Sequence, residues 1–82
     1  MTDTEDKYVE LIKFLHRLGF KESGRFVWTN ENIMIYFRGN YNEWRIMDTT
    51  TTHGMDLTSF KIPLNSEEKK RIWKTVSDNY KG

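Results

Sequence analysis

The 82-residue sequence contains no cysteine, a single proline and no long apolar segment, and each absence narrows what the chain can be. Without cysteine there are neither disulfide bonds nor thiolate metal sites, a composition compatible with a reducing compartment. No apolar run approaches the roughly 20 residues that cross a bilayer, and the acidic start MTDTED is unlike a signal peptide. We therefore expect a soluble, cytoplasmic protein.

The sequence also lacks an excess of either charge. Thirteen lysines and arginines against twelve aspartates and glutamates give a formal net charge of +1. This balance is unlike the strong basic excess of a typical nucleic-acid-binding domain and unlike the acidic excess of a DNA mimic. Any electrostatic argument must therefore rest on where the charges lie along the chain. The length fits one domain, residues 1–82, with a single small core.

Residues suited to catalysis are few and form no recognisable motif. The two histidines, His16 and His53, have no spacing that links them, and a metal site needs at least three converging ligands. Four serines without a nucleophile elbow give no support to nucleophilic catalysis. Gly39 and Gly54 are lone turn glycines and do not form a phosphate cradle. We therefore expect no enzymatic activity, no cofactor and no bound metal.

The first twenty residues have the periodicity of an amphipathic helix from about Thr4 to Leu18. Apolar residues recur every three or four positions, at Tyr8, Leu11, Ile12, Leu15 and Leu18. Gly19 stands where a left-handed residue ends a helix. Phe20 is then expected to close onto Leu15 in a Schellman motif.

The period of the apolar residues changes to two after residue 25. Three segments alternate in this way, and the turn-like stretches TNEN and GNYN separate them. Their apolar residues are Phe26 and Trp28 in the first, Ile33, Ile35 and Phe37 in the second, and Trp44 and Ile46 in the third. The pattern predicts three antiparallel strands joined by hairpins. The polar stretch TTTTHGMD, residues 49–56, indicates a loop, although its four threonines are also compatible with an extended strand. Phe60, Ile62 and Leu64 alternate again, and Pro63 restricts this piece to an edge strand or an extended connector.

A second amphipathic helix is predicted from Ser66 to about Tyr80. Asn65 and Glu68 have the spacing of a capping box before it. Its apolar stripe consists of Ile72, Trp73, Val76 and Tyr80. The order helix, three or four antiparallel strands, helix indicates a two-layer α+β fold in which both helices cover one face of the sheet.

This arrangement divides the strand residues between a helix-covered face and a reverse face. If Ile33 and Ile35 face the helices, their neighbours along each strand face away. The reverse face is enriched in arginine, methionine and tyrosine, which is typical of binding surfaces. We predict a partner-binding site there, made of Arg25, Met34, Tyr36, Arg38, Arg45 and Met47. Two alternatives stay open: that arginine stems merely shield the apolar residues on this face, or that one helix packs on each face of the sheet.

A second candidate site is the basic start of the second helix. Lys69, Lys70, Arg71 and Lys74 lie close together near the positive end of the helix dipole, where phosphate is favoured. This group indicates RNA or DNA binding as an alternative function. A solvated helix face is the other interpretation of the same charges.

The element order and the first helix resemble two known families. The order of one helix, three strands and one helix resembles double-stranded-RNA-binding domains, and ELIKFLHRLGF, Glu10–Phe20, is similar to the first helix of HicA-type mRNA-cleaving toxins. The first resemblance implies that Lys69 and Lys70 contact phosphate. Residues 39–41 replace the Gly-Pro-x-His loop of the RNA-binding family, and residues 26–28 replace the region of the toxins' catalytic histidine.

Three hypotheses about function follow. The first is a non-enzymatic interaction module that binds and inhibits or regulates a larger protein through the reverse sheet face and adjacent loops, as phage- or mobile-element-encoded regulators do. The second is RNA or DNA binding through the basic start of the second helix. The third is a homodimer, made by pairing edge strands or by stacking two reverse faces.

Overall fold

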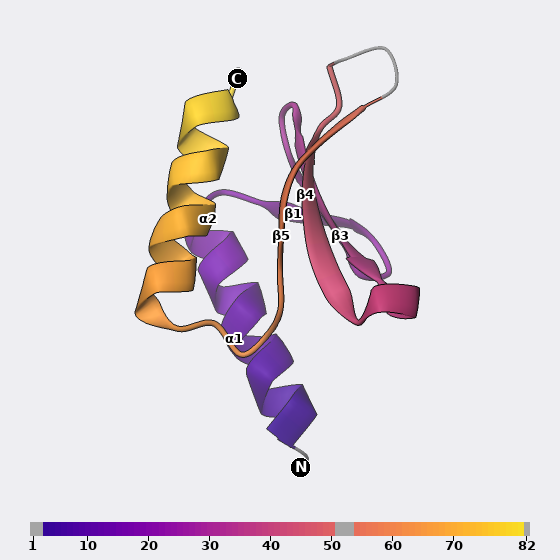
Figure 1. The fold of residues 1–82 in the computed structure, drawn as a ribbon, viewed down its shortest axis with the longest axis vertical. Helices are drawn as coiled ribbons and strands as arrows, with labels where there is room; N and C mark the ends of the chain where they lie inside the picture. Colours follow the sequence, from indigo (N-terminus) through magenta and orange to yellow (C-terminus); the bar gives the residue numbers. More distant parts are fainter. Residues whose placement is uncertain (1–2, 51–53, 82) are drawn as a thin grey trace.

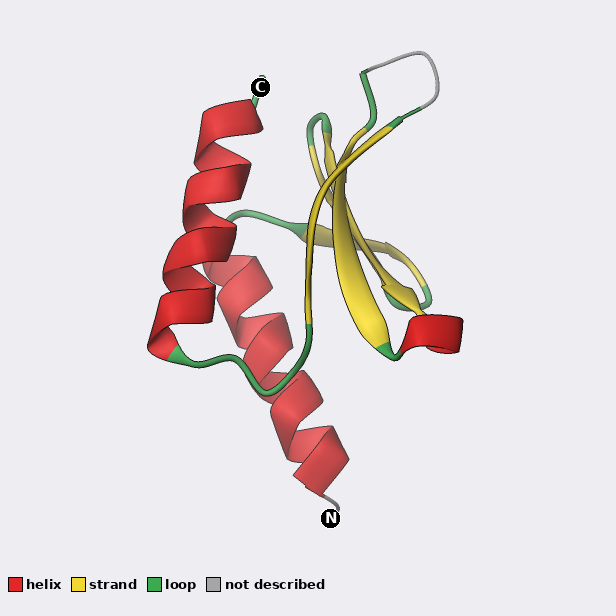
Figure 2. Ribbon diagram, viewed as in Figure 1, coloured by secondary structure: helices red, strands yellow, loops and turns green. Residues whose placement is uncertain are grey.

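The computed structural model describes residues 3–50 and 54–81. Its elements are, in chain order, α1 (Asp3–Arg17), β1 (Lys21–Gly24), β2 (Val27–Asn30), β3 (Ile33–Arg38), the short 3-10 helix η1 (Gly39–Tyr41), β4 (Glu43–Asp48), β5 (Met55–Phe60) and α2 (Ser66–Asn79). The strands form one antiparallel sheet in the order β1-β2-β3-β4-β5, a simple meander (Figure 2). Both helices lie on the same side of this sheet (Figure 1). No helix in the described part of the chain is long and apolar enough to cross a membrane.

The α+β class and the antiparallel sheet are confirmed, but the prediction of three or four strands is wrong, because the sheet has five. The strand that was not predicted is β1, whose sequence KESG is exposed throughout and has no apolar alternation. It is held by pairing with β2 alone. β5 begins at Met55, inside the segment predicted as a loop, and ends at Phe60. The five strands also depart from the three-stranded layout of the RNA-binding family.

The end of α1 has the predicted Schellman geometry. The backbone N–H of Gly19 donates to the carbonyl of His16, and that of Phe20 donates to the carbonyl of Leu15, both at 3.0 Å. Gly19 has a φ of 89°, in the left-handed region that favours glycine. A Cβ atom at this position would lie 3.2 Å from Nδ2 of Asn30. The turn that starts the sheet therefore depends on this glycine.

Gly19→Ala is expected to lower the free energy of unfolding by about 1 to 2 kcal/mol, because alanine pays a steric cost in the left-handed region. Urea denaturation followed by circular dichroism measures the change. Gly24→Ala is the matched control, since its φ is not in that region and the added Cβ meets only Val27 at 3.9 Å. Equal losses in the two variants would show that the turn tolerates a side chain.

The start of α2 is capped as predicted. The Asn65 side chain accepts a hydrogen bond from the backbone N–H of Glu68 at 2.8 Å. The helix runs from Ser66 to Asn79, one residue short of the predicted end. The connector before it contains a cis peptide bond between Ile62 and Pro63.

The core lies between the helices and one face of the sheet. Its buried members are Leu11 and Leu15 of α1, Ile72 and Val76 of α2, and Phe20, Trp28, Ile33, Ile35, Trp44, Ile46 and Phe60. The strand register places Ile35 opposite both Trp28 and Ile46, so these side chains share the covered face. Phe26, predicted in a strand, is instead a turn residue with a φ of 59°. Its ring contacts Tyr8 of α1 at 5.5 Å and therefore still faces the helices.

Two buried polar residues, Asn32 and Asp48, join the sheet to the end of α2. The Asn32 amide nitrogen donates to the Asn79 carbonyl at 2.8 Å and to the Asp48 carboxylate at 3.1 Å. The Asn32 side-chain oxygen accepts the backbone N–H of Lys81 at 2.7 Å. Hydrogen bonds from the hydroxyl and N–H of Thr50, and then from Asn32, hold the pKa of Asp48 well below its ordinary value. The C-terminal residues are thereby fastened to the β2–β3 turn.

Candidate functional site

The sheet has a face that neither helix covers, and we name it the open face (Figure 1). It is formed by the half-buried side chains of Val27, Met34, Tyr36, Arg38, Arg45 and Met47. In the strand register Tyr36 lies between Val27 and Arg45, and Met34 lies opposite Met47. Directly paired residues share a face, so Val27, Tyr36 and Arg45 form one row and Met34 and Met47 an adjacent row, with Arg38 opposite Glu43 in a third.

Arg45 is fixed at the centre of the open face by two carboxylates. Its Nε donates to Oε1 of Glu43 at 3.1 Å, and its Nη1 donates to Oδ2 of Asp56 at 2.7 Å. The Tyr36 hydroxyl reaches the other oxygen of Asp56 at 3.4 Å. With only 28% of its side chain exposed, Arg45 lies against the sheet instead of extending into solvent. The positive charge of Arg45 is therefore largely neutralised by Glu43 and Asp56.

The pKa values of both side chains reflect this network. Burial raises the pKa of Tyr36 above its ordinary value, and the negative charge of Asp56 adds to the increase. Partial burial opposes the charged form of Arg45, but the hydrogen bonds to Glu43 and Asp56 outweigh this effect and raise its pKa. At neutral pH the Tyr36 phenol is protonated and the Arg45 guanidinium is charged. These are the protonation states that the hydrogen bonds to Asp56 and Glu43 require.

Of the other two predicted arginines, Arg38 lies at the margin of the open face, whereas the prediction that Arg25 belongs to this face is not supported, because Arg25 lies over a ring that packs on α1. The Arg38 guanidinium stacks over the exposed ring of Tyr41 in η1, 4.6 Å from its centroid. Arg25 belongs to the β1–β2 turn, not to a strand, and lies over the ring of Phe26 at 5.6 Å. Neither forms an ion pair with any part of the chain that the structure describes. On the open face the positive charge without an ion pair among the described residues is therefore that of Arg38, at the margin and not at the centre.

The strands alone are too small for a standard protein interface. At about 3.3 Å per residue and 4.8 Å between strands, they cover roughly 400 Å², against about 800 Å² that one partner usually contributes. The flanking segment η1 adds exposed surface, because Tyr41 is 58% exposed. A partner on the open face must also contact this segment.

The structure separates the basic residues at the start of α2. Arg71 donates to the Ser59 carbonyl at 2.7 Å, contacts the Thr58 hydroxyl and pairs with Glu68 at 2.6 Å. It is therefore fastened to β5. Lys69, Lys70 and Lys74 form no ion pair within residues 3–50 and 54–81. The predicted four-cation cluster is reduced to three free lysines.

The histidines do not come together in a site. His16 is exposed on α1, and the edge of its ring contacts Trp28 with centroids 5.3 Å apart. His53 lies outside the described residues. Among residues that the structure describes, no three histidine or acidic side chains are grouped closely enough to hold a metal ion.

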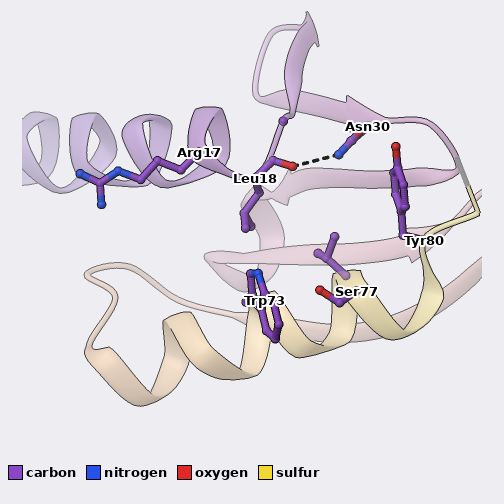
Figure 3. Close-up of a pocket in the computed structure, with 8 residues that line it drawn as sticks. Arg17, Leu18, Asn30, Trp73, Ser77 and Tyr80 are labelled. Atoms are coloured by element: carbon purple, nitrogen blue, oxygen red, sulfur yellow. Dashed lines mark hydrogen bonds between the residues drawn. The ribbon is translucent and has the colours of Figure 1, made fainter.

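An open groove of about 520 Å³ lies between the end of α1 and α2 (Figure 3). It is lined by Arg17, Leu18, Gly19, Asn30, Trp73, Val76, Ser77 and Tyr80. The apolar stripe predicted for α2 included Trp73 and Tyr80, yet these side chains are 57% and 43% exposed. The helical spacing already separates these residues. Ile72 and Val76 are one turn apart and reach the core, whereas the side chain of Trp73 is rotated about 100° around the helix from that of Ile72.

No protein-family model, curated protein or solved structure matches this chain. Function must therefore be argued from the side chains of the open face and the groove.

Proposed function

We propose that this chain is a small non-enzymatic interaction module that binds a larger protein through the open face and η1, and that it inhibits or regulates that protein by occluding a surface. The observation that carries the proposal is the uncovered pair of rows that contains Met34, Tyr36 and Met47. Tyrosine and methionine supply large, adaptable contact area, and Tyr36 is among the residue types that dominate binding energy.

The Arg45 network supports binding by fixing the surface before a partner arrives. A guanidinium held by Glu43 and Asp56 loses little conformational entropy on association. Its charge is already compensated, so it does not require an acidic partner group at the centre of the interface. Arg38 at the margin has no such compensation. The complementary surface is therefore apolar at its centre and acidic at its rim.

The sheet edges favour a different protein over a second copy of this chain. The edge strand β1 carries Lys21 and Glu22, and charged side chains discourage pairing between edges. The other edge, β5, is partly covered where Arg71 donates to the Ser59 carbonyl. Light scattering at high concentration tests this point, and a dimer that Tyr36→Ala dissociates would redirect the proposal to self-association.

The double variant Tyr36→Ala, Arg38→Glu is expected to lose the partner protein in affinity purification from the native cell, because it removes the central aromatic and reverses the marginal charge. A loss of about 2 kcal/mol or more corresponds to at least thirtyfold weaker binding. Circular dichroism should remain that of the parent, since both side chains lie outside the core.

A matched control changes the same kinds of residue on the helix side. Trp73→Ala with Lys74→Glu also removes an exposed aromatic ring and reverses one charge. This variant should retain the partner. Equal recovery of the partner by both double variants, or its loss from the helix-side variant alone, would remove the open face as the binding site.

A further inference from the structure

The groove between the end of α1 and α2 combines two exposed aromatic rings with unpaired cations on the side of the molecule opposite the open face. We infer that it binds single-stranded nucleic acid, with bases stacked on Trp73 and Tyr80 and phosphates held by the surrounding cations. This site is independent of the proposed protein-binding function, because it uses different residues on a different surface.

The aromatic rings lie on one wall of the groove. Trp73 lies on α2 and Tyr80 directly follows the last residue of this helix, two turns and about 10 Å further along the same side. Figure 3 shows the side chains of Trp73 and Tyr80 on the side of α2 that faces Leu18 and Asn30. The Asn30 amide donates to the Leu18 carbonyl at 3.0 Å and fixes that opposite wall. Exposed aromatic rings can serve as stacking platforms for bases, whatever the base sequence.

The charges around the groove favour a polyanion. Arg17 lines one end of the groove, with its side chain extending along α1 away from Tyr80 (Figure 3). Lys69 and Lys70 are outside the lining and precede Trp73 by about one turn of α2. None of these three cations forms an ion pair within the described ranges of the chain. Of the residues that the structure describes, no acidic one lines the groove. Unpaired cations beside aromatic rings match the alternation of phosphate and base along a single strand.

The nearby acidic residues of α2 do not cancel this field within the groove. Glu68 is engaged with Arg71 at 2.6 Å, on the side of α2 that meets β5. Glu67 and Asp78 are rotated about 120° and 140° around the helix from Trp73. The positive charge therefore remains on the groove side of α2.

A peptide is less well matched to this groove. An extended peptide takes most of its affinity from backbone hydrogen bonds to a sheet edge, and the walls here are two helix segments and the last residue of β2. The Asn30 amide nitrogen is already used by Leu18. The groups that remain available to a ligand are the exposed aromatic rings and the positive charges.

Intrinsic fluorescence provides a direct test, because the other two tryptophans, Trp28 and Trp44, are buried in the core. Oligothymidylate and oligouridylate of about twelve nucleotides should each quench the emission of Trp73 at about 50 mM salt. The two oligomers distinguish DNA from RNA as the preferred strand. About three phosphate contacts predict a slope of log affinity against log salt near −2.

Trp73→Ala is expected to weaken binding of a labelled oligonucleotide tenfold or more in fluorescence anisotropy, and Arg17→Glu with Lys70→Glu should abolish it. Tyr41→Ala is the matched control, since Tyr41 is as exposed as Trp73 but lies beside the open face. It should bind as the parent does. Unchanged thermal melting of Trp73→Ala confirms that the fold is retained.

Three results would overturn the inference. The first is no binding of either oligonucleotide by the parent protein at about 50 mM salt. The second is equal weakening by Trp73→Ala and Tyr41→Ala, or preference for a duplex of the same length. The third is quenching of Trp73 by an acidic proline-rich peptide that oligonucleotides do not displace, which would assign the groove to a peptide.

Discussion

Ile35→Ala is expected to lower the free energy of unfolding by about 3 to 4 kcal/mol, and to leave much of the protein unfolded at room temperature. Ile35 is fully buried between the sheet and the helices, and removing three carbon atoms there costs both their burial and the cavity they leave. A domain of this size retains only a few kcal/mol of net stability. Urea denaturation of parent and variant measures the difference.

The adjacent residue, Tyr36, supplies the control for this prediction. It follows Ile35 on β3 but belongs to the open face. Tyr36→Ala should cost well under half as much, because the phenol is only half-buried and its contact with Asp56 is long, at 3.4 Å. Similar losses from the two substitutions would mean that both faces of the sheet are packed.

Asn32→Ala is expected to cost about 2 to 3 kcal/mol, although it removes no apolar side chain. The substitution leaves the Asn79 carbonyl and the Lys81 N–H without their partner and takes one donor from Asp48. Buried polar groups without partners carry this order of penalty. Asn40→Ala, at an exposed position in η1, is the control and should melt as the parent does. A loss below about 0.5 kcal/mol would show that the cluster contributes little.

Acid should weaken the same cluster. Because the native pKa of Asp48 lies below its ordinary value of 3.8, the carboxylate stabilises the fold above that pH, and the contribution is lost as the pH falls toward the native pKa. Urea midpoints at about pH 7 and about pH 3 should therefore differ less in Asp48→Asn than in the parent. An equal acid shift in both would place the sensitive carboxylate elsewhere.

The two helices and their ends were predictable because the controlling signals are local. The apolar spacing of Leu11 and Leu15, the Gly19 terminator and the Asn65 cap act within a few residues of one another. The alternation of Ile33 and Ile35 likewise separates the two faces of β3 from sequence alone.

The edge strands were not predictable in the same way. β1 is exposed throughout and is held by backbone pairing with β2, so its sequence carries no burial pattern. β5 contains a register shift opposite Ile46 and Met47, which breaks the alternation that would have marked it. An edge strand is defined by its pairing with a neighbouring strand and by the register of that pairing. Neither can be predicted from the few residues of the edge strand itself.

The sequence predicted most of the residues that form the open face, but not that the positive charge at its centre is neutralised. Alternation placed Tyr36, Arg45 and Met47 on one face, whereas the neutralisation of Arg45 by Asp56 requires the register of β4 with β5. The sequence places Trp73 in the apolar stripe of α2, yet its side chain is exposed. Its exposure depends on how α2 is rotated against the sheet, which packing fixes.

Oxidative footprinting of methionine in the captured complex tests the central claim most directly. Met34 and Met47 lie on the open face, whereas the exposed Met55 pairs with Asp48 on the helix side of the sheet. We predict that partner binding protects Met34 and Met47 from oxidation and leaves Met55 reactive. Unchanged oxidation of Met34 and Met47 in the complex would contradict the account.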